Sequence, residues 1–284
     1  TKFANDISSH AKVAWNSYFS NKRGYDLNGT FRVDSIVDIV KEYKNGNKNV
    51  FPKNIEIVTG GFPCQDFSVS GKRNGFNSHK DHNGTIKENI PTEETRGKLY
   101  MWMKEVIEIT SPKIFIAENV KGLANLGTVK HIIQADFSKT NGDGYLVLPP
   151  KVLHAGNFGV PQSRERIFFI GLKKSALTKK ALQELSKVEI SEKYSPYPIA
   201  THRINGEMHY SSVEDKMATF TKSKSVLLDL EEPEKSKDLS QNYYSKAKFM
   251  GKHCQGQKEI NLDKLAPTIR AEHHGNIEFR RLSI

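Results

Sequence analysis

The sequence predicts an α/β fold with a mainly parallel sheet, and three short apolar runs carry this prediction. They cover residues 55–59, 114–117 and 166–172, and each has the composition of a buried strand. Residues 5–19 and 99–109 instead place apolar side chains at helical spacing. Because strands and helices alternate along the chain, we expect a sheet covered by helices. Ligands in such sheets bind beyond the carboxyl ends of the strands.

The first predicted elements are the end of a strand and a helix, both within residues 5–19. Ser8 and Ser9 are suitable N-cap residues, because a serine hydroxyl accepts a hydrogen bond from the free N–H groups of a first helical turn. The helical spacing is carried by Ala11, Val13, Ala14, Trp15, Tyr18 and Phe19.

The strand predicted at residues 55–59 should deliver a loop. It stops at Gly60 and Gly61, whose missing Cβ atoms permit a sharp turn. The helix predicted over residues 99–109 then leads into the strand at residues 114–117. The first two strands therefore place whatever follows them at one edge of the sheet.

The composition and periodicity of the sequence change after Leu172. Residues 173–265 hold lysine-rich and glutamate-rich stretches and few strong periodic runs. We interpret them as a second, smaller domain, so that residues 1–172 and 266–284 form the main one. Residues 66–97 are a long polar stretch, and loops of that length in compact domains are usually functional or mobile.

Composition narrows the class of protein. The 284 residues are 37% hydrophobic and 26% charged, which is typical of a water-soluble globular protein with one large or two smaller domains. No apolar run approaches the ~20 residues of a membrane span, and we expect no signal peptide. The formal net charge of +11 favours nucleic acid as a partner, although many basic proteins bind none. Two cysteines are too few for a disulfide framework, so we expect a reducing, cytoplasmic setting.

Cys64 lies in the segment Gly60-Gly61-Phe62-Pro63-Cys64-Gln65, directly after the predicted strand. The proline fixes its own φ, so the thiol is carried on a rigid turn at the carboxyl end of a strand. A nucleophilic side chain needs an exposed and rigid position of this kind. A free cysteine more often only packs in a core, but this context favours a reactive thiol.

Two further segments carry chemistry. Glu118 ends an apolar strand, where a carboxylate is costly unless it is paired, protonated or used. The alternative is a carboxylate that caps the following helix. Arg164 and Arg166 occupy alternate positions as a strand begins, so both guanidinium groups can point to one face and bind a carboxylate, a phosphate or a base carbonyl. Surface clusters of this composition are common, and the motif alone is weak.

Together these segments resemble the DNA (cytosine-5) methyltransferase family, whose blocks include G-F-P-C-Q with a following F-S, E-N-V, and Q-x-R-x-R ahead of a strand. Here they occur in the same order at residues 60–68, 118–120 and 162–166. Residues 96–99 are similar to the family's R-G-x-L. The resemblance covers essentially the whole chain. It implies the Rossmann-like fold of S-adenosylmethionine-dependent methyltransferases, with a smaller target-recognition domain at residues 173–265.

The resemblance also implies catalytic roles. Cys64 would attack carbon 6 of a cytosine that has been flipped out of duplex DNA. Glu118 would hold a proton at ring nitrogen 3, and Arg166 with Arg164 would hold the base carbonyl and orient Glu118. Asn119 is expected to position the loop, and the sequence offers no clear base for the final proton abstraction.

S-adenosylmethionine is the implied methyl donor. Asp6 has the place of the acidic residue that holds the cofactor ribose, and Asp34 that of the residue that meets the adenine amino group. The other implied cofactor contacts are Ile7, Ser35, Pro63 and Leu99. The implied DNA contacts are Gln65, Ser68, Ser70, Lys72 and Gln162.

The ends of the chain depart from the family pattern. No F-x-G-x-G block precedes Asp6, and Arg280-Arg281-Leu282 resembles the start of a block that normally continues. We therefore expect a fragment or one part of a split enzyme, with a second chain or missing segments completing the cofactor site, and otherwise a monomer.

Two other functions stay open. A tRNA-methylating branch of the family shares the nucleophile and E-N-V blocks, although the sizeable segment 173–265 favours DNA. A catalytically silent DNA-binding homologue is the alternative from another class, and the intact residues Cys64, Glu118 and Arg166 argue against it. The pairs at residues 253–254 and 273–274 do not form a metal-ligand set, so we expect no metal.

Overall fold

The computed structural model describes residues 1–26, 29–62, 100–125, 129–142, 144–204, 218–227, 258–259, 261–268 and 279–280. The chain divides into two compact units. Unit 1 consists of Thr1–Val152 and Arg166–Ser195, and unit 2 of Leu153–Glu165 and Pro196–Ile284. The domain limits predicted from the sequence stay a prediction.

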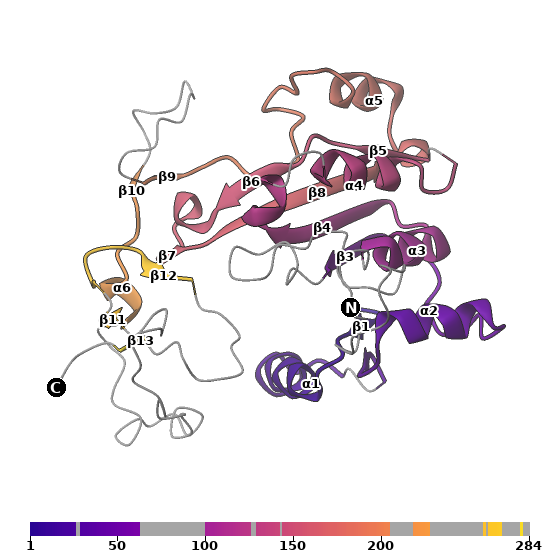
Figure 1. The fold of residues 1–284 in the computed structure, drawn as a ribbon, viewed down its shortest axis with the longest axis horizontal. Coiled ribbons are helices and arrows are strands. Elements are labelled where there is room, and N and C mark those ends of the chain that lie inside the picture. Colours follow the sequence, from indigo (N-terminus) through magenta and orange to yellow (C-terminus); the bar gives the residue numbers. More distant parts are fainter. Residues whose placement is uncertain are drawn as a thin grey trace, which may run out of the picture. The chain divides into compact units, whose positions relative to one another are not determined.

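Unit 1 alternates strands with helices along most of its length (Figure 1). Its elements, including β6 and β8, which continue into unit 2, are β1 (Ala4–Asn5), α1 (Ser9–Asn16), the π-helix η1 (Ser17–Lys22), β2 (Phe31–Arg32), α2 (Ile36–Lys44), β3 (Ile57–Gly61), α3 (Tyr100–Thr110), β4 (Ile114–Val120), the 3₁₀ helix η4 (Lys121–Asn125), α4 (Val129–Ser138), β5 (Tyr145–Val147), β6 (Lys151–His154), β8 (Glu165–Lys173), the 3₁₀ helix η6 (Lys174–Ala176) and α5 (Lys179–Leu185).

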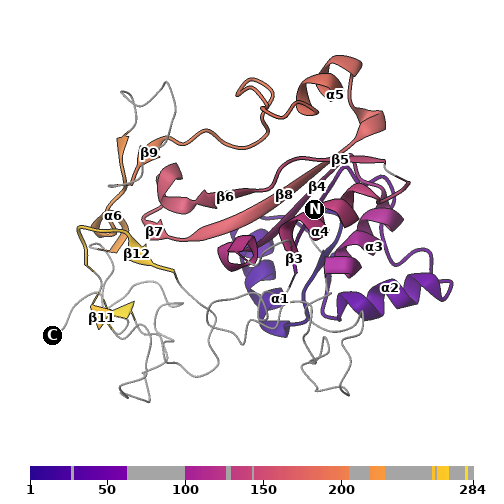
Figure 2. The same ribbon diagram turned by 45° about the horizontal axis from the view of Figure 1, so that its top comes forward.

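The main sheet has the strand order β3-β4-β8-β5, with β6 also pairing with β8. β3 and β4 are parallel, whereas β8 is antiparallel to both β4 and β5. Three of these four strands therefore run in one direction, and β8 runs against them (Figure 2). A separate parallel pair joins β1 to β2. The predicted α/β fold with mainly parallel strands is confirmed, as are the three predicted strands and both predicted helices.

The core of unit 1 lies between one face of this sheet and helices α3 and α4. Phe115 and Ala117 of β4 and Phe169 of β8 are fully buried there, together with Ile107 of α3 and Phe137 of α4. The sheet residues share a face because side chains alternate along a strand. Glu118 is the next residue after Ala117 and so belongs to the opposite face.

One position in this core admits no side chain. Gly171 pairs with Phe115 across β4 and β8. A Cβ atom on Gly171 would lie 1.9 Å from Cε1 of the Phe115 ring. The phenyl ring therefore occupies the space that any other residue would need at this point of the sheet.

A second apolar cluster joins α2 to α3. Val37, Ile39 and Val40 of α2 pack with Phe51 and with Trp102 of α3. Ser35 caps α2, because its hydroxyl oxygen accepts a hydrogen bond from Val37 N at 3.3 Å. This cap fixes where the chain leaves β2 and enters the helix.

Two details differ from the sequence predictions. β3 continues through Gly60 and Gly61 rather than stopping before them, and neither glycine has a positive φ. Both stay in the strand because the parallel ladder pairs them with Ala117 and Glu118. At α1 the N-cap is Ser8, as predicted, but its side chain makes no capping hydrogen bond.

Unit 2 is described in short elements. They are η5 (Ala155–Phe158), β7 (Gln162–Ser163), β9 (His202–Arg203), β10 (Ala218–Thr219), α6 (Lys224–Leu227), β11 (Lys258–Glu259), β12 (Ala266–Pro267) and β13 (Phe279–Arg280). The strands form three parallel pairs, β7 with β12, β9 with β10, and β11 with β13. Among all described residues, no helix combines the length and apolar character needed to span a membrane.

Candidate active site

The carboxyl ends of β3 and β4 lie side by side in unit 1. The two strands are parallel, and their ladder ends with Gly61 opposite Glu118. Phe62 follows β3 and is buried in the core. Pro63 and Cys64 come next in the chain and lie outside the described residues, as do Gln65, Ser68, Ser70, Lys72 and Leu99. The described part of β3 and Phe62 therefore ends next to Glu118, and Cys64 follows two residues later in the sequence.

Glu118 forms an ion pair with Arg166. Nε of Arg166 lies 2.7 Å from Oε1 of Glu118, and the two side chains are 21% and 35% exposed. Phe168 is paired directly with Glu118, and Arg166 is two residues before it on the same face of β8. The antiparallel direction of β8 is what brings this guanidinium group to the end of β4.

The other oxygen of Glu118 lies over Gly61. A Cβ atom on Gly61 would be 3.1 Å from Oε2, which is closer than such atoms normally approach. Arg166 thus holds Oε1 while the bare backbone of Gly61 leaves room for Oε2. The carboxyl group is held through Oε1, has space at Oε2 and remains partly open to solvent.

Asn119 ties the two strand ends together from the helix-covered face. Its side chain is almost fully buried, its Nδ2 donates to the carbonyl of Phe62 at 3.1 Å, and its Oδ1 accepts from Val120 N at 2.8 Å. The side-chain amide continues the link between β3 and β4 beyond their last paired residues. It holds the backbone two residues before Cys64, which agrees with the positioning role expected from the sequence.

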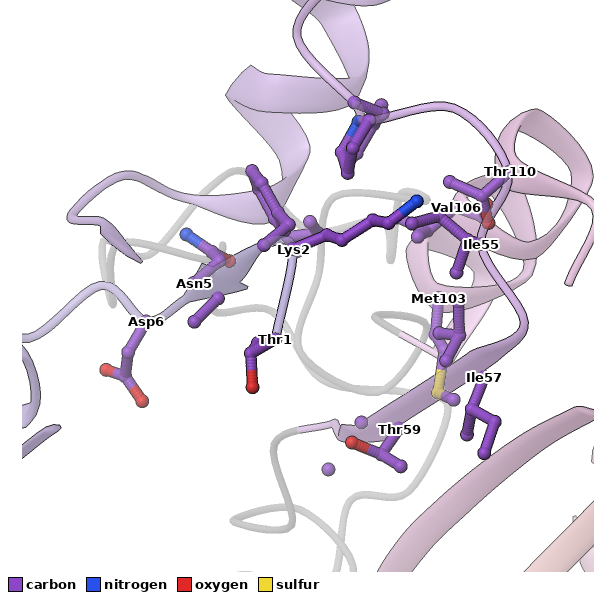
Figure 3. Close-up of a pocket in the computed structure, with 18 of the residues that line it drawn as sticks. Thr1, Lys2, Asn5, Asp6, Ile55, Ile57, Thr59, Met103, Val106 and Thr110 are labelled. Atoms are coloured by element: carbon purple, nitrogen blue, oxygen red, sulfur yellow. The ribbon is translucent and has the colours of Figure 1, made fainter. Parts of the chain in front are cut away.

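A cavity of about 980 Å³ lies in unit 1 beside β3. Asn5 and Asp6 line one part of it, while Thr59 of β3 and Met103 of α3 line another (Figure 3). Asp34, Ser35, Gly60, Gly61 and Phe62 also line the cavity, so that it reaches the strand end that leads to Cys64.

Four of the six predicted cofactor residues line this one cavity. They are Asp6, Ile7, Asp34 and Ser35. The hydroxyl oxygen of Ser35 accepts the capping hydrogen bond from Val37 N, and the O–H group can still donate to a ligand. Pro63 and Leu99, the other two predicted residues, are outside the described part of the chain.

The sequence predictions missed two residues next to these acids. Nδ2 of Asn5 donates to the carbonyls of Asp34 at 2.8 Å and Arg32 at 3.2 Å. The Arg32 guanidinium group in turn contacts the Asp34 carboxylate, with Nη2 to Oδ2 at 2.9 Å. Their positions beside Asp6 and Asp34 in the sequence were a signal for them.

Gln162 and Arg164 belong to unit 2. Gln162 lies in β7 and pairs with Ala266 of β12. Arg164 occupies the one-residue break between β7 and β8, and its carbonyl accepts a hydrogen bond from Ala155 N at 2.8 Å. Arg164 is therefore not on one continuous strand with Arg166, and the alternation of side chains along a strand does not fix its direction.

No group of three or more potential metal-binding side chains occurs in the part of the chain that the structure describes. The residue pairs at 253–254 and 273–274 lie outside it.

Comparison with known proteins gives the family. The model of the C-5 cytosine-specific DNA methylase family matches residues 5–280, nearly the whole chain. The chain belongs to this family. The match runs through β3, β4 and β8, and so includes every residue of the arrangement described above.

Individual relatives are bacterial and phage methyltransferases. The type II methyltransferase M.HpaII of Haemophilus parainfluenzae is 40% identical over 134 residues, covering 45% of this chain and 31% of the relative. The orphan methyltransferase M.SPRI of Bacillus phage SPR is 26% identical over 277 residues, covering 87% of this chain and 58% of the relative. The chain thus spans between about a third and three fifths of the length of these two relatives.

Among solved structures, one that resembles part of this chain is the Dnmt2 methyltransferase of S. pombe. It is 14% identical and matches 67% of this chain and 49% of its own, with a TM-score of 0.38. C-5 cytosine methylases use S-adenosylmethionine as the methyl donor.

Proposed function

We propose that this methylase transfers a methyl group from S-adenosylmethionine to carbon 5 of a cytosine in a specific sequence of double-stranded DNA. The supporting observation is the Glu118–Arg166 ion pair at the end of β4, next to the strand end that leads into Pro63 and Cys64. The carboxyl group and the guanidinium group come from β4 and β8, and the nucleophile would come from the residues that follow β3 in the sequence. Cytosine methylation at carbon 5 needs these three groups.

Cys64 supplies the nucleophile. Carbon 5 of cytosine is a poor nucleophile, and addition of the Cys64 thiolate to carbon 6 converts the ring into an enamine whose carbon 5 can attack an electrophilic methyl group. The target base must leave the helix stack for this addition, as in other enzymes that carry out chemistry on a base.

Glu118 and Arg166 act on the same ring. Electron density moves toward ring nitrogen 3 as the carbon–sulfur bond forms, and a proton shared between that nitrogen and Glu118 neutralises it. Arg166 keeps the carboxyl group in place through Oε1 and, together with Arg164, would hold the base carbonyl. Once carbon 5 carries the methyl group, a base removes the carbon-5 proton and the carbon–sulfur bond breaks to release the Cys64 thiolate.

The cavity beside β3 fits the cofactor by the chemistry of its lining. Asp6 presents a carboxylate that accepts hydrogen bonds from ribose hydroxyls, and Asp34 one that accepts from the adenine amino group. Ile7, Ser35, Pro63 and Leu99 would complete the contacts. When bound, S-adenosylmethionine supplies the electrophilic methyl group.

DNA would be recognised outside this centre. Gln65, Ser68, Ser70, Lys72 and Gln162 are the proposed contacts near the flipped base, and residues 173–265 the target-recognition domain. Base edges would be read by a few side chains, with lysines mainly holding phosphates.

Trapping on a duplex oligonucleotide that carries 5-fluorocytosine tests this proposal. Fluorine at carbon 5 cannot leave as a proton would, so the adduct accumulates in the presence of S-adenosylmethionine and survives denaturing electrophoresis. We expect an adduct with the native protein and with Cys254→Ser, which removes the chain's other cysteine, and none with Cys64→Ser. An intact protein that forms no adduct would refute the mechanism, and an adduct on 5-fluorocytosine tRNA but not on duplex DNA would refute the substrate.

A further inference from the structure

Arg32 links the cavity wall to helix α2. Its Nε and Nη2 lie 3.0 and 2.9 Å from Oδ2 of Asp34, and its Nη1 lies 2.9 Å from Oε2 of Glu42. Asn47 donates to the other oxygen of Glu42. The guanidinium plane is therefore fixed between two carboxylates, one on the cavity wall and one on α2.

The backbone of Asp34 is held as firmly as its side chain. Nδ2 of Asn5 donates to the carbonyls of both Arg32 and Asp34, and Asp6 N donates to the carbonyl of Arg32 at 3.3 Å. Because β1 and β2 pair at Asn5 and Arg32, these bonds tie Asp34 to the strand that leads into Asp6. Asp6 and Asp34 thus belong to one hydrogen-bonded frame in the cavity wall.

The contacts with Arg32 have a directional consequence for Asp34. Both Nε and Nη2 of Arg32 contact Oδ2 of Asp34, so Arg32 does not occupy the other oxygen, Oδ1. An ionised carboxylate only accepts hydrogen bonds. A carboxylate that is fixed in this way attracts a donor such as an exocyclic amino group and repels a carbonyl oxygen.

The ionisation of the cluster agrees with this geometry. Partial burial acts to lower the pKa of Arg32, yet hydrogen bonds with Glu42 and Asp34 outweigh it and raise that pKa above its usual value. The pKa of Glu42 is lowered, chiefly by its hydrogen bond with Arg32. Arg32 and Glu42 therefore remain charged across the physiological range.

We propose that Arg32, held in place by Glu42, is a positioning residue that fixes the Asp34 carboxylate so that the cavity selects a 6-aminopurine nucleoside over its 6-oxo counterpart. The proposal rests on the cofactor site assigned above and adds a residue that sets its selectivity. Arg32 itself touches no part of the ligand in this scheme, because it acts through Asp34.

Binding selectivity tests the proposal without relying on methyl transfer. Calorimetry on the intact protein compares S-adenosylhomocysteine with S-inosylhomocysteine, which has a carbonyl in place of the amino group at purine carbon 6 and a proton on ring nitrogen 1. We expect the native protein to prefer the adenosyl compound, and Arg32→Gln to lower that preference roughly tenfold, since a polar site rejects a mismatched group only while its own groups are held in place. Glu42→Gln should lower the preference for the adenosyl compound less than Arg32→Gln does. Arg32→Lys should retain part of that preference.

Lys44→Gln is the matched control. It removes another ion pair of α2, that of Lys44 with Glu105 at 2.9 Å, and neither residue lines the cavity. Its selectivity should equal that of the native protein. In an Asp34→Ala background the preference should be small, and Arg32→Gln should not change it further. In methyl-transfer assays Arg32→Gln should raise KM for the cofactor and leave kcat nearly unchanged.

The outcomes separate this inference from the proposed function. A native protein that prefers the adenosyl compound and an Arg32→Gln variant that keeps the full preference would overturn the role of Arg32 alone. A native protein that binds neither compound, or both equally, would overturn the assignment of Asp34 and this inference with it, whereas adduct formation by Cys64 would still be tested by trapping.

Discussion

Replacing Asn119 with alanine should destabilise unit 1 by an amount that its two hydrogen bonds set. The substitution leaves the carbonyl of Phe62 and the N–H of Val120 without their side-chain partner in a buried setting. Each such loss costs about 1–3 kcal/mol, so we expect a total of roughly 3 kcal/mol. With a urea m value of about 1–3 kcal/mol per molar, the unfolding midpoint should fall by on the order of 1 M.

Tryptophan fluorescence during urea unfolding measures this loss, because both tryptophans of the chain, Trp15 and Trp102, belong to unit 1. Gln134→Ala is the matched control. It removes an amide that donates to the carbonyls of Val147 and Leu148 at 3.2 and 3.3 Å, at the far side of the same sheet. Both variants should be less stable, but only Asn119→Ala should also reduce adduct formation with 5-fluorocytosine DNA under conditions where both are folded.

Two results would refute this reasoning. A midpoint change below about 0.3 M would mean that Asn119 is not a significant link between β3 and β4. Equal adduct yields for Asn119→Ala and Gln134→Ala, both measured on folded protein, would mean that fixing the carbonyl of Phe62 has no effect on the nucleophile that follows it.

Three further substitutions test other parts of unit 1. Gly171→Ala should cost at least about 3 kcal/mol in urea unfolding, because its Cβ would lie 1.9 Å from the ring of Phe115, and Phe115→Leu should recover part of that loss. Burial and a hydrogen bond with Asp136 on α4 raise the pKa of Tyr100 above its usual value. The stabilisation from this shift is complete below pH ~10 and is lost as the pH rises further. Tyr100→Phe should therefore make the free energy of unfolding less dependent on pH in alkali. Gly61→Ala should reduce the adduct yield more than stability, since its methyl group displaces Oε2 of Glu118.

Much of the sheet was predictable because local patterns determine it. The apolar runs that become β3, β4 and β8 are visible in the sequence, and so is the helical spacing of α3. The direction of β8 was not predictable, because the composition of a strand does not specify whether its neighbours are parallel or antiparallel. That direction determines whether Arg166 reaches Glu118. The family resemblance implied this contact, but the pattern of the strands did not.

The residues of the cavity wall could likewise be predicted only in part from the sequence. Asp6 and Asp34 were predicted from their similarity to family positions, and the structure places both on one cavity. Asn5 was missed because its hydrogen bond with Asp34 depends on β1 pairing with β2 across more than twenty intervening residues. Arg32 was missed although its contact with Asp34 spans only two positions of the sequence. The role of Cys64 stays a prediction, since that residue lies outside the described part of the chain.

The two glycines at the end of β3 leave room for side chains from both neighbouring elements, α3 and β4. Predicted as a turn, Gly60 and Gly61 are instead strand residues that face opposite sides of the sheet. A Cβ on Gly60 would meet Sδ of Met103 at 3.1 Å on the side of α3, and a Cβ on Gly61 would meet Oε2 of Glu118 at 3.1 Å on the other side. Because Gly60 has no Cβ, α3 can pack closely against the end of the strand. Because Gly61 has none, the Glu118 carboxyl group has space. The two glycines are therefore required by their neighbours on both faces rather than by a turn. A residue with a Cβ at position 60 should disturb the packing of α3, whereas one at position 61 should displace the carboxyl group of Glu118.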